Sequence, residues 1–152
     1  MSLTRTLDAT FLNGVANHPE VRPWLGTDGE SFADLGVLLA LPGAFALQNE
    51  HGGFVFTPTN EEGGYEFHTQ FLPEGRGRKA LAASLEAERM MFENFGARVL
   101  HTYVPHDNAA AFGLVRIAGF TRTHEDEANS YWALTRADWQ ARRDRASPRM
   151  NA

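Results

Sequence analysis

Three basic side chains, Arg76, Arg78 and Lys79, are crowded between Pro73 and an Ala/Leu-rich run. A strand that ends at this proline and turns through glycines into a helix leaves several backbone N–H groups of the first helical turn without partners. Those groups and the positive end of the helix dipole attract anions, and Gly77 lets an anion approach the backbone closely. Arginine adds paired donors that suit phosphate oxygens. These residues therefore indicate a site for a phosphorylated ligand.

The same segment has a second interpretation, a solvated helix start. Cations at a helix N-terminus are unfavourable unless an anion is present, so the two interpretations differ in whether a ligand binds. Two common phosphate motifs do not fit, because the segment has neither the Gly-Lys-Ser/Thr of a P-loop nor the Gly-x-Gly-x-x-Gly of dinucleotide-binding proteins. A P-loop nucleoside triphosphatase and a Rossmann-type enzyme are therefore not predicted.

The composition is that of an ordinary soluble globular protein. The 152 residues are 43% hydrophobic and 22% charged, no apolar run is long enough to cross a bilayer, and the N-terminus lacks the apolar core of a signal peptide. The net charge of −5 disfavours a nucleic-acid-binding surface spread over the protein. We expect a cytoplasmic protein with no nucleic-acid or membrane partner, one domain over residues 1–140, and a fraying basic tail over 141–152.

The absence of cysteine from the sequence excludes several kinds of chemistry. Without a thiol the chain has no disulfide, no thiolate zinc site and no cysteine nucleophile. The histidines do not show the His-x-x-x-His spacing of a helical metal site. We expect no metal, and any acyl transfer must be direct or use another nucleophile.

Periodicity and turn residues predict the elements that position the basic corner. The first third favours two short helices, the second capped by Ser31 and stopped by Pro42-Gly43. Three segments, FALQN, GFVFTPT and YEFHTQF, follow with turn signals between them and favour an antiparallel meander. A helix from about Gly77 to Phe95 comes next, with alanines on the face beside its apolar stripe, so that it can lie close to a sheet. That stripe is formed by Leu81, Leu85, Phe92 and Phe95.

The second half adds a strand, a helix and a hairpin. ARVLHTYV is typical of a buried strand, and Asn108 to Ala118 of a short helix closed by Gly119. FTRTH and NSYWALT form the expected hairpin around an acidic turn. This order of elements predicts a mixed α/β layer architecture.

Two spaced motifs give the chain a resemblance to a known family. They are Pro73-Glu74 followed by Arg76-Gly77-Arg78, and later Asn108 with Ala111 and Gly119-Phe120. In this order they resemble the GNAT superfamily of acyl-CoA-dependent N-acyltransferases, from about residue 44 to 135. The resemblance implies a central mixed, mostly antiparallel sheet of about six to seven strands, flanked by about four helices, with the acceptor-binding part in the first 43 residues.

The resemblance also implies roles for individual residues. Phe71 and Leu72 would offer backbone groups to the pantetheine arm and thioester carbonyl of acetyl-CoA. Asn108 would meet the pantetheine or cap its own helix. The pyrophosphate would be wrapped by Arg76, Gly77, Arg78, Lys79 and Ala80.

Three residues depart from the family's pattern. Lys79 and Leu81 stand where further glycines are frequent, which suggests a charge at Lys79 in place of close backbone approach. Val115 stands where a tyrosine often protonates the leaving thiolate. Another group or water must then protonate the coenzyme, whose thiolate, with a pKa of about 8.5 to 9, is already a fair leaving group.

Candidate catalytic bases lie on the segment YEFHTQF. An amine acceptor is mostly protonated at neutral pH, so a base must take its proton before it attacks a thioester. Strand alternation puts Glu66, His68 and Gln70 on one face. The pKa of histidine is closest to working pH, so His68 is the candidate base, and Glu66 could orient it or act through a water. A polar pair on a solvated face explains the same two residues, and His106 is a second candidate.

The implied function is transfer of the acetyl group of acetyl-CoA to a primary amine, on a small molecule or a peptide, within one ternary complex. Two alternatives stay open. Val115 and the missing glycines favour a coenzyme-binding or partner-binding module without turnover, and the same scaffold suits a longer acyl group. A homodimer through the final strand pair is compatible with the sequence.

Overall fold

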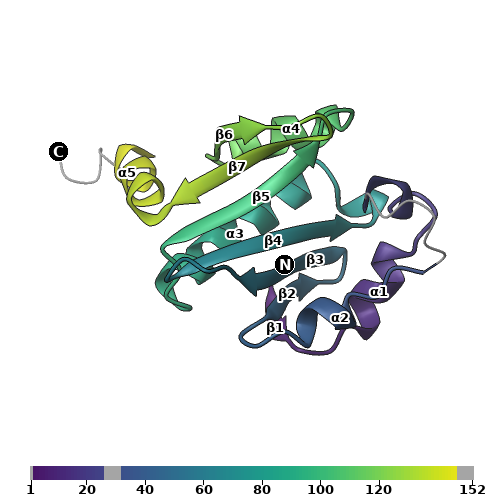
Figure 1. The fold of residues 1–152 in the computed structure, drawn as a ribbon. Helices are drawn as coiled ribbons and strands as arrows, with labels where there is room; N and C mark the ends of the chain where they lie inside the picture. Colours follow the sequence, from purple (N-terminus) through teal and green to yellow (C-terminus); the bar gives the residue numbers. More distant parts are fainter. Residues whose placement is uncertain (1, 26–31, 147–152) are drawn as a thin grey trace.

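The computed structural model of the chain describes residues 2–25 and 32–146, which form a seven-stranded sheet with helices on both faces (Figure 1). The strands are β1 (Thr4–Thr6), β2 (Phe45–Asn49), β3 (Gly52–Pro58), β4 (Gly64–Phe71), β5 (Val99–Pro105), β6 (Thr121–Glu125) and β7 (Asn129–Thr135). The α-helices are α1 (Thr10–Ala16), α2 (Gly36–Leu39), α3 (Arg78–Glu93), α4 (Ala109–Ile117) and α5 (Arg136–Ala146), and the 3₁₀ turns are η1 (Arg22–Leu25) and η2 (Pro73–Gly75).

The strand order is β1-β2-β3-β4-β5-β7-β6. Neighbouring strands are antiparallel except β4 and β5, which are parallel. The predicted mixed, mostly antiparallel sheet and its β2–β4 meander are therefore confirmed. The strand β1 was not predicted, because its three residues are too few to show a strand pattern.

The first third contains both predicted helices. The proposed cap of the second, Ser31, lies outside the described residues. At the start of α2 the carboxylate of Asp34 accepts the N–H of Gly36 at 2.9 Å. At the other end of the chain, α5 overlaps the predicted basic tail, and residues 147–152 are not among those described. Over 2–25 and 32–146, the helices lack the combined length and apolar character needed to cross a bilayer.

The apolar stripe predicted on α3 is confirmed except at one position. Phe92 is buried, and Leu81 and Phe95 are partly buried against the same core. Leu85, placed in the apolar stripe, is 42% exposed, whereas Ala80, Ala83 and Ala87 are buried against the sheet. The prediction was wrong for Leu85, because it considered only the size and spacing of apolar side chains. The facing strands already carry phenylalanines, so the small side chains of α3 let the helix approach them. Its other part, that the alanines bring the helix close to the sheet, is confirmed.

Alternation along the strands divides the buried side chains into two cores. The larger core lies under α3 and α4, which are behind the sheet in Figure 1, and also includes Trp139 of α5. It contains Phe54, Phe67 and Trp132. The smaller core lies on the opposite face, where Ala46 and Val55 meet α1 and α2. The helices of the second face pack against β3 and β4, so they do not extend over β5, β7 and β6.

The strands β4 and β5 are paired at one end only. Their register runs from Gly64↔Val99 to Glu66↔His101. On its other edge β4 pairs with β3 along its whole length, from Tyr65 to Phe71. Within the described residues, β4 therefore has a neighbouring strand on one side only beyond Glu66, and the sheet splits at its centre.

Candidate active site

The backbone of β4 faces the split at alternate residues. The N–H of Leu72 donates to the His51 carbonyl at 2.8 Å, on the β3 side. The Phe67 carbonyl accepts the Thr102 hydroxyl at 3.2 Å, on the β5 side. Because strand residues alternate in direction, the N–H and C=O groups of Thr69 and Phe71 also point into the split. Within the described residues no strand pairs with these groups, so an extended ligand can use them.

The direction of each backbone group shows which of the residues predicted at the end of β4 can contact a ligand in the split. Phe71 has its backbone groups in the split, as expected of a residue that holds a pantetheine arm. The N–H of Leu72 is already bonded to the His51 carbonyl, so it is not available to a ligand. Thr69 was missed, although the alternation that selects Phe71 also selects the residue two positions before it.

The basic corner has the predicted form of strand, turn and helix. η2 follows β4, and Gly77, at φ 70° and ψ −128°, immediately precedes α3. This conformation is open to glycine and strained for other residues. Of the described side chains, none caps this end of α3, so the N–H groups of its first turn remain available to an anion.

The three basic side chains of the corner are not equivalent. Arg76 donates from Nη2 to the carbonyl of Glu20 at 2.7 Å, which ties the corner to the segment before η1. Arg78 and Lys79 are exposed in the first turn of α3. Two cations therefore remain at the surface beside the open helix end, where an anion is needed to offset the helix dipole.

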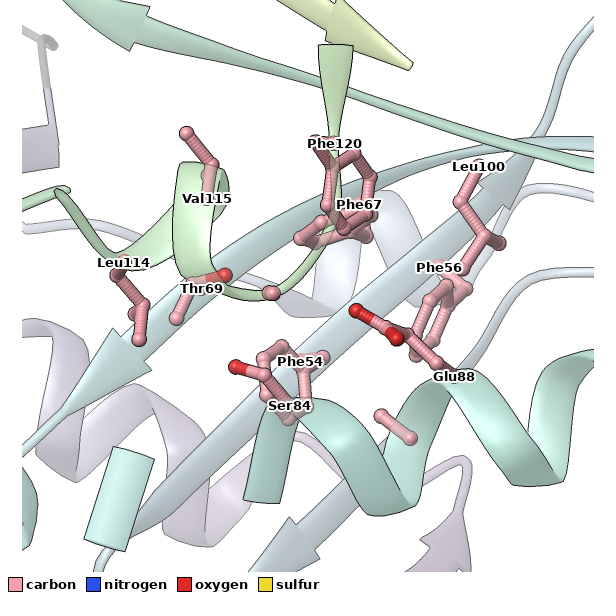
Figure 2. Close-up of a pocket in the computed structure, with 12 residues that line it drawn as sticks. Phe54, Phe56, Phe67, Thr69, Ser84, Glu88, Leu100, Leu114, Val115 and Phe120 are labelled. Carbon is pink, nitrogen blue, oxygen red and sulfur yellow. The ribbon is translucent and has the colours of Figure 1, made fainter. Parts of the chain in front are cut away.

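A small cavity lies between the sheet, α3 and α4 (Figure 2). Its volume is about 30 Å³, and its lining includes Thr69 of β4, Val115 of α4 and Glu88 of α3. The position at which the family often has a tyrosine therefore faces this cavity with an apolar side chain. At the start of α4, the Asn108 Oδ1 accepts the N–H of Ala111 at 3.1 Å, which confirms the capping role of Asn108.

The candidate bases lie on the opposite face of β4. His68 Nε2 is 3.5 Å from Glu66 Oε1, and the side chains are 23% and 44% exposed. Burial lowers the pKa of His68, and the Glu66 carboxylate partly opposes this effect. The third member of the predicted polar face, Gln70, is buried and donates to the Gly53 carbonyl at 3.1 Å. The structure thus brings two of the three residues to an accessible site.

Tyr103 completes this pair from the other side of the split. Its ring is edge-on to His68 at a centroid distance of 6.0 Å. Burial and the Glu66 carboxylate both raise the pKa of the Tyr103 phenol. Tyr103 was not predicted as a site residue, because the register that sets β5 beside β4 is a long-range property.

An open hollow of about 370 Å³ lies on the same face, across β4, β5, β7 and β6. Its polar lining includes Glu61, Glu66, His101, His124 and Tyr131. The His101 Nε2 is 3.1 Å from Glu61 Oε1. Two carboxylates in one hollow suit a cationic ligand.

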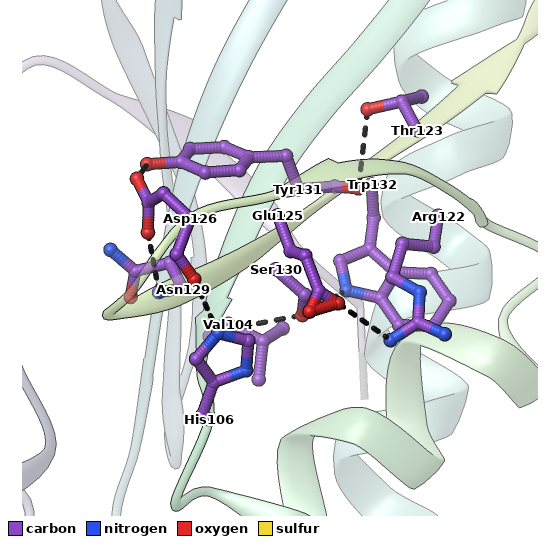
Figure 3. A network of polar contacts seen from close by, with 10 residues as sticks. All are labelled: Val104, His106, Arg122, Thr123, Glu125, Asp126, Asn129, Ser130, Tyr131 and Trp132. Atoms are coloured by element: carbon purple, nitrogen blue, oxygen red, sulfur yellow. Dashed lines mark hydrogen bonds and ion pairs between the residues drawn. The ribbon is translucent and has the colours of Figure 1, made fainter.

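His106, the second candidate base, takes part in a different network (Figure 3). Its Nε2 donates to the carbonyl of Asp126 at 2.7 Å, in the turn between β6 and β7. The Asp126 carboxylate also accepts the Tyr131 hydroxyl at 2.6 Å. This network fixes the hairpin turn, which leaves His106 with a structural partner. Among residues 2–25 and 32–146, no group of three or more His, Asp or Glu side chains is placed to hold a metal ion.

Comparison with known proteins gives matches in structure. No family model and no curated protein matches the sequence. The spermidine N-acetyltransferase of Vibrio cholerae, in complex with CoA and spermine, aligns with a TM-score of 0.70 at 14% identity, over 91% of this chain and 98% of that one. The aminoglycoside acetyltransferase AAC(6′)-Ib, in complex with coenzyme A and kanamycin, aligns with a TM-score of 0.70 at 15% identity, over 93% and 99%. The chain has the GNAT fold.

A third GNAT structure gives a shorter alignment. The Campylobacter jejuni N-acetyltransferase PseH, in complex with acetyl coenzyme A, aligns with a TM-score of 0.51 at 23% identity, over 61% of this chain and 67% of that one. These likenesses confirm the fold that the motifs around Arg76 and Asn108 implied. The two longer alignments show that the GNAT fold extends over most of the chain.

Proposed function

We propose that this protein is an acetyl-CoA-dependent N-acetyltransferase that transfers the acetyl group directly to a primary amine. The observation that carries the proposal is the parting of β4 from β5, which opens unpaired backbone groups beside the uncapped N-terminus of α3. A thioester on an extended, phosphorylated arm fits this pair of features. The GNAT neighbours support it, since they were crystallised with acetyl-CoA or CoA.

The residues present fit acetyl-CoA as co-substrate. The N–H groups of Arg78, Lys79 and Ala80, behind Gly77, would hold the pyrophosphate, and the two basic side chains would add charge. The backbone groups of Thr69 and Phe71 would hold the pantetheine arm and the thioester carbonyl. Arg76 would contribute mainly by fixing the corner, because its guanidinium already binds the Glu20 carbonyl.

The proposed reaction begins with the acceptor amine on the open face. His68 is largely neutral at working pH because burial lowers its pKa, so it can take the amine proton. Glu66, 3.5 Å away, would stabilise the imidazolium that forms. The neutral nitrogen then attacks the thioester carbon, and a backbone N–H in the split stabilises the charge on the carbonyl oxygen. No residue of the chain needs to carry the acetyl group.

The acceptor we propose is a cationic amine, on a small molecule or a peptide. The hollow beside His68 contains Glu61 and Glu66, which favour a positively charged group. The amine ligands spermine and kanamycin of two GNAT neighbours support an acceptor of this charge.

The proposal extends to location and assembly. We place the enzyme in the cytoplasm, which cell fractionation tests. We also keep a homodimer through β6 and β7 as part of the proposal. Its support is that all five residues of β6, at the edge of the sheet, are exposed. Sedimentation at several concentrations tests it.

An amine panel tests the activity. Purified protein is mixed with acetyl-CoA and polyamines, aminoglycosides, amino sugars or lysine peptides, and release of free thiol is followed against a control without amine. We expect amine-dependent release for at least one class. Thermal shifts with acetyl-, succinyl- and longer acyl-CoA identify the preferred acyl group. An absence of stabilisation by every acyl-CoA would contradict the proposal.

A second candidate function is a coenzyme-binding module without turnover. It is favoured by Val115, which presents no acid to the cavity where the family often has a tyrosine. Stabilisation by acetyl-CoA without thiol release from any amine would support this alternative.

A further inference from the structure

A carboxyl group is buried beside the proposed thioester site. Glu88, on α3, is 3% exposed. Its Oε2 has no hydrogen-bond partner within the described residues. Figure 2 shows the carboxyl group pointing from α3 into the space between the helix and the sheet, toward the side of Thr69 and Val115. Buried polar atoms are normally paired, so an unpaired carboxyl oxygen aimed into a cavity needs an explanation.

The surroundings of Glu88 favour its protonated form. Burial raises its pKa to about 8, and the guanidinium of Arg142, on α5, opposes that effect. Among the described residues that line the cavity, Glu88 is the only titratable one. The nearby Ser84 hydroxyl already donates to the Ala80 carbonyl at 2.9 Å. The group is therefore mostly a neutral carboxylic acid at pH 7, able to donate a proton.

Thr69 relates this acid to the split, because it lines the same cavity as Glu88. Its backbone is directed into the gap between β4 and β5. Val115 lines the cavity from α4, at the position where a proton donor would be expected. The volume of about 30 Å³ is enough for one water between the acid and the split.

We propose that Glu88 is the general acid of the acetyl transfer, protonating the sulfur of the departing coenzyme directly or through one water. This role rests on the proposed function. The amine lone pair forms the C–N bond, and the nitrogen then loses its remaining excess proton to solvent. The electron pair of the breaking C–S bond passes to sulfur, and sulfur takes the proton of the Glu88 carboxyl. Solvent returns a proton to Glu88 after the thiol leaves, and His68 releases the proton it took from the amine.

A purely structural role for this carboxyl is less economical. An unpaired buried acid costs free energy that an apolar side chain of similar size would not. The other buried residues of α3 are Ala80, Ala83, Ala87, Met91 and Phe92, so the helix packs without needing a polar group there. A bound ligand that interacts with the carboxyl group would explain an acid at this position.

The kinetic test compares Glu88→Gln with Glu93→Gln, an exposed glutamate at the end of the same helix. Glutamine keeps the shape and removes the acidic proton. We expect kcat at pH 7 to fall at least about tenfold in E88Q, with the KM for acetyl-CoA within about twofold. The wild-type kcat should also fall as pH rises through about 8, and E88Q should lack this limb. A kcat within about twofold of wild type, or a retained limb, would overturn the role.

A second measurement does not depend on turnover. The thiol of bound CoA is titrated by the ultraviolet absorbance of its thiolate, in wild type, E88Q and E93Q. Ionised Glu88 beside the sulfur repels the thiolate, so the bound thiol should have a higher pKa in wild type and E93Q than in E88Q. Equal thiol pKa values with intact binding would remove Glu88 alone from the mechanism. A wild type that binds no CoA would overturn the proposed function as well.

Discussion

The two faces of the sheet are built differently, and they shift the pKa values of two side chains in opposite directions. The pKa of Glu88 is raised on one face, and the pKa of His68 is lowered on the other. Behind β4, a core of aromatic and alanine side chains surrounds Glu88 and raises its pKa to about 8. On the other face, partial burial lowers the pKa of His68 beside an open polar hollow. Burial disfavours charge in both cases. It therefore yields an acid on one side of the split and a base on the other, which is what transfer from a thiol to an amine requires.

The largest expected effect is on the binding of CoA at the start of α3. We expect Gly77→Asp to weaken CoA binding at least about a hundredfold, because a carboxylate enters the anion site at the start of α3. Gly77→Ala is the matched control, since it imposes the same backbone strain at φ 70° without a charge. Calorimetric titration with CoA measures both. Equal losses in the two variants would mean that strain, and not charge, is responsible.

The second prediction concerns how the buried Glu88 changes the free energy of unfolding with pH. Glu88 has a folded-state pKa above its unfolded value of 4.5, so the folded chain keeps this proton to higher pH. Its contribution to stability is complete below pH 4.5 and is lost as pH rises toward about 8. The wild type should therefore lose on the order of a few kcal/mol relative to E88Q between pH 5 and 8. Urea unfolding at several pH values measures this, and parallel pH dependences would contradict it.

The third prediction tests the role of His68 as the base on the opposite face of β4. We expect His68→Ala to lower kcat at least about tenfold while the affinity for CoA stays within a few-fold, because the base acts on the amine and not on the coenzyme. His106→Ala is the control, since its imidazole is bonded in the β6–β7 turn. Steady-state kinetics with the best amine of the panel measures both variants. Unchanged turnover in H68A would remove this residue from the mechanism.

The smallest effect is expected at Asn108. Asn108→Ala should lower the free energy of unfolding by about 1 kcal/mol, because the N–H of Ala111 loses its acceptor. Asn108→Asp keeps an acceptor and should retain that stability. If Asn108 also contacts the pantetheine, N108D will weaken CoA binding at unchanged stability. Denaturant titration and CoA binding of the two variants separate the roles.

The sequence predicted those parts of the site whose signals are local. The corner at Gly77 and the β2–β4 meander follow from turn residues and alternation over a few positions. Tyr103 was missed because its importance depends on how β5 lies beside β4, which short-range patterns do not report. Thr69 was missed although strand alternation, which is a local pattern, groups its backbone with that of Phe71. Glu88 had a signal that was not used: it lies one position after Ala87, within the spacing of the buried alanines on α3.

The burial of α3 shows why local patterns are insufficient. The pattern of large apolar residues selected Phe92, which is buried, and also Leu85, which is 42% exposed. Which face a helix buries depends on the space left by the partner surface, and here phenylalanines of β3 and β4 fill that space. Pattern analysis of one helix does not include the size of the side chains opposite it.

The split between β4 and β5 has a consequence for how such a chain can change over evolutionary time. A binding slot made of peptide N–H and C=O groups persists through most substitutions, since every residue except proline brings the same two groups. Side chains around the slot are then free to drift as long as the strands stay apart. This gives a physical reason why a shared fold can persist at 14% identity, where no family model matches the sequence.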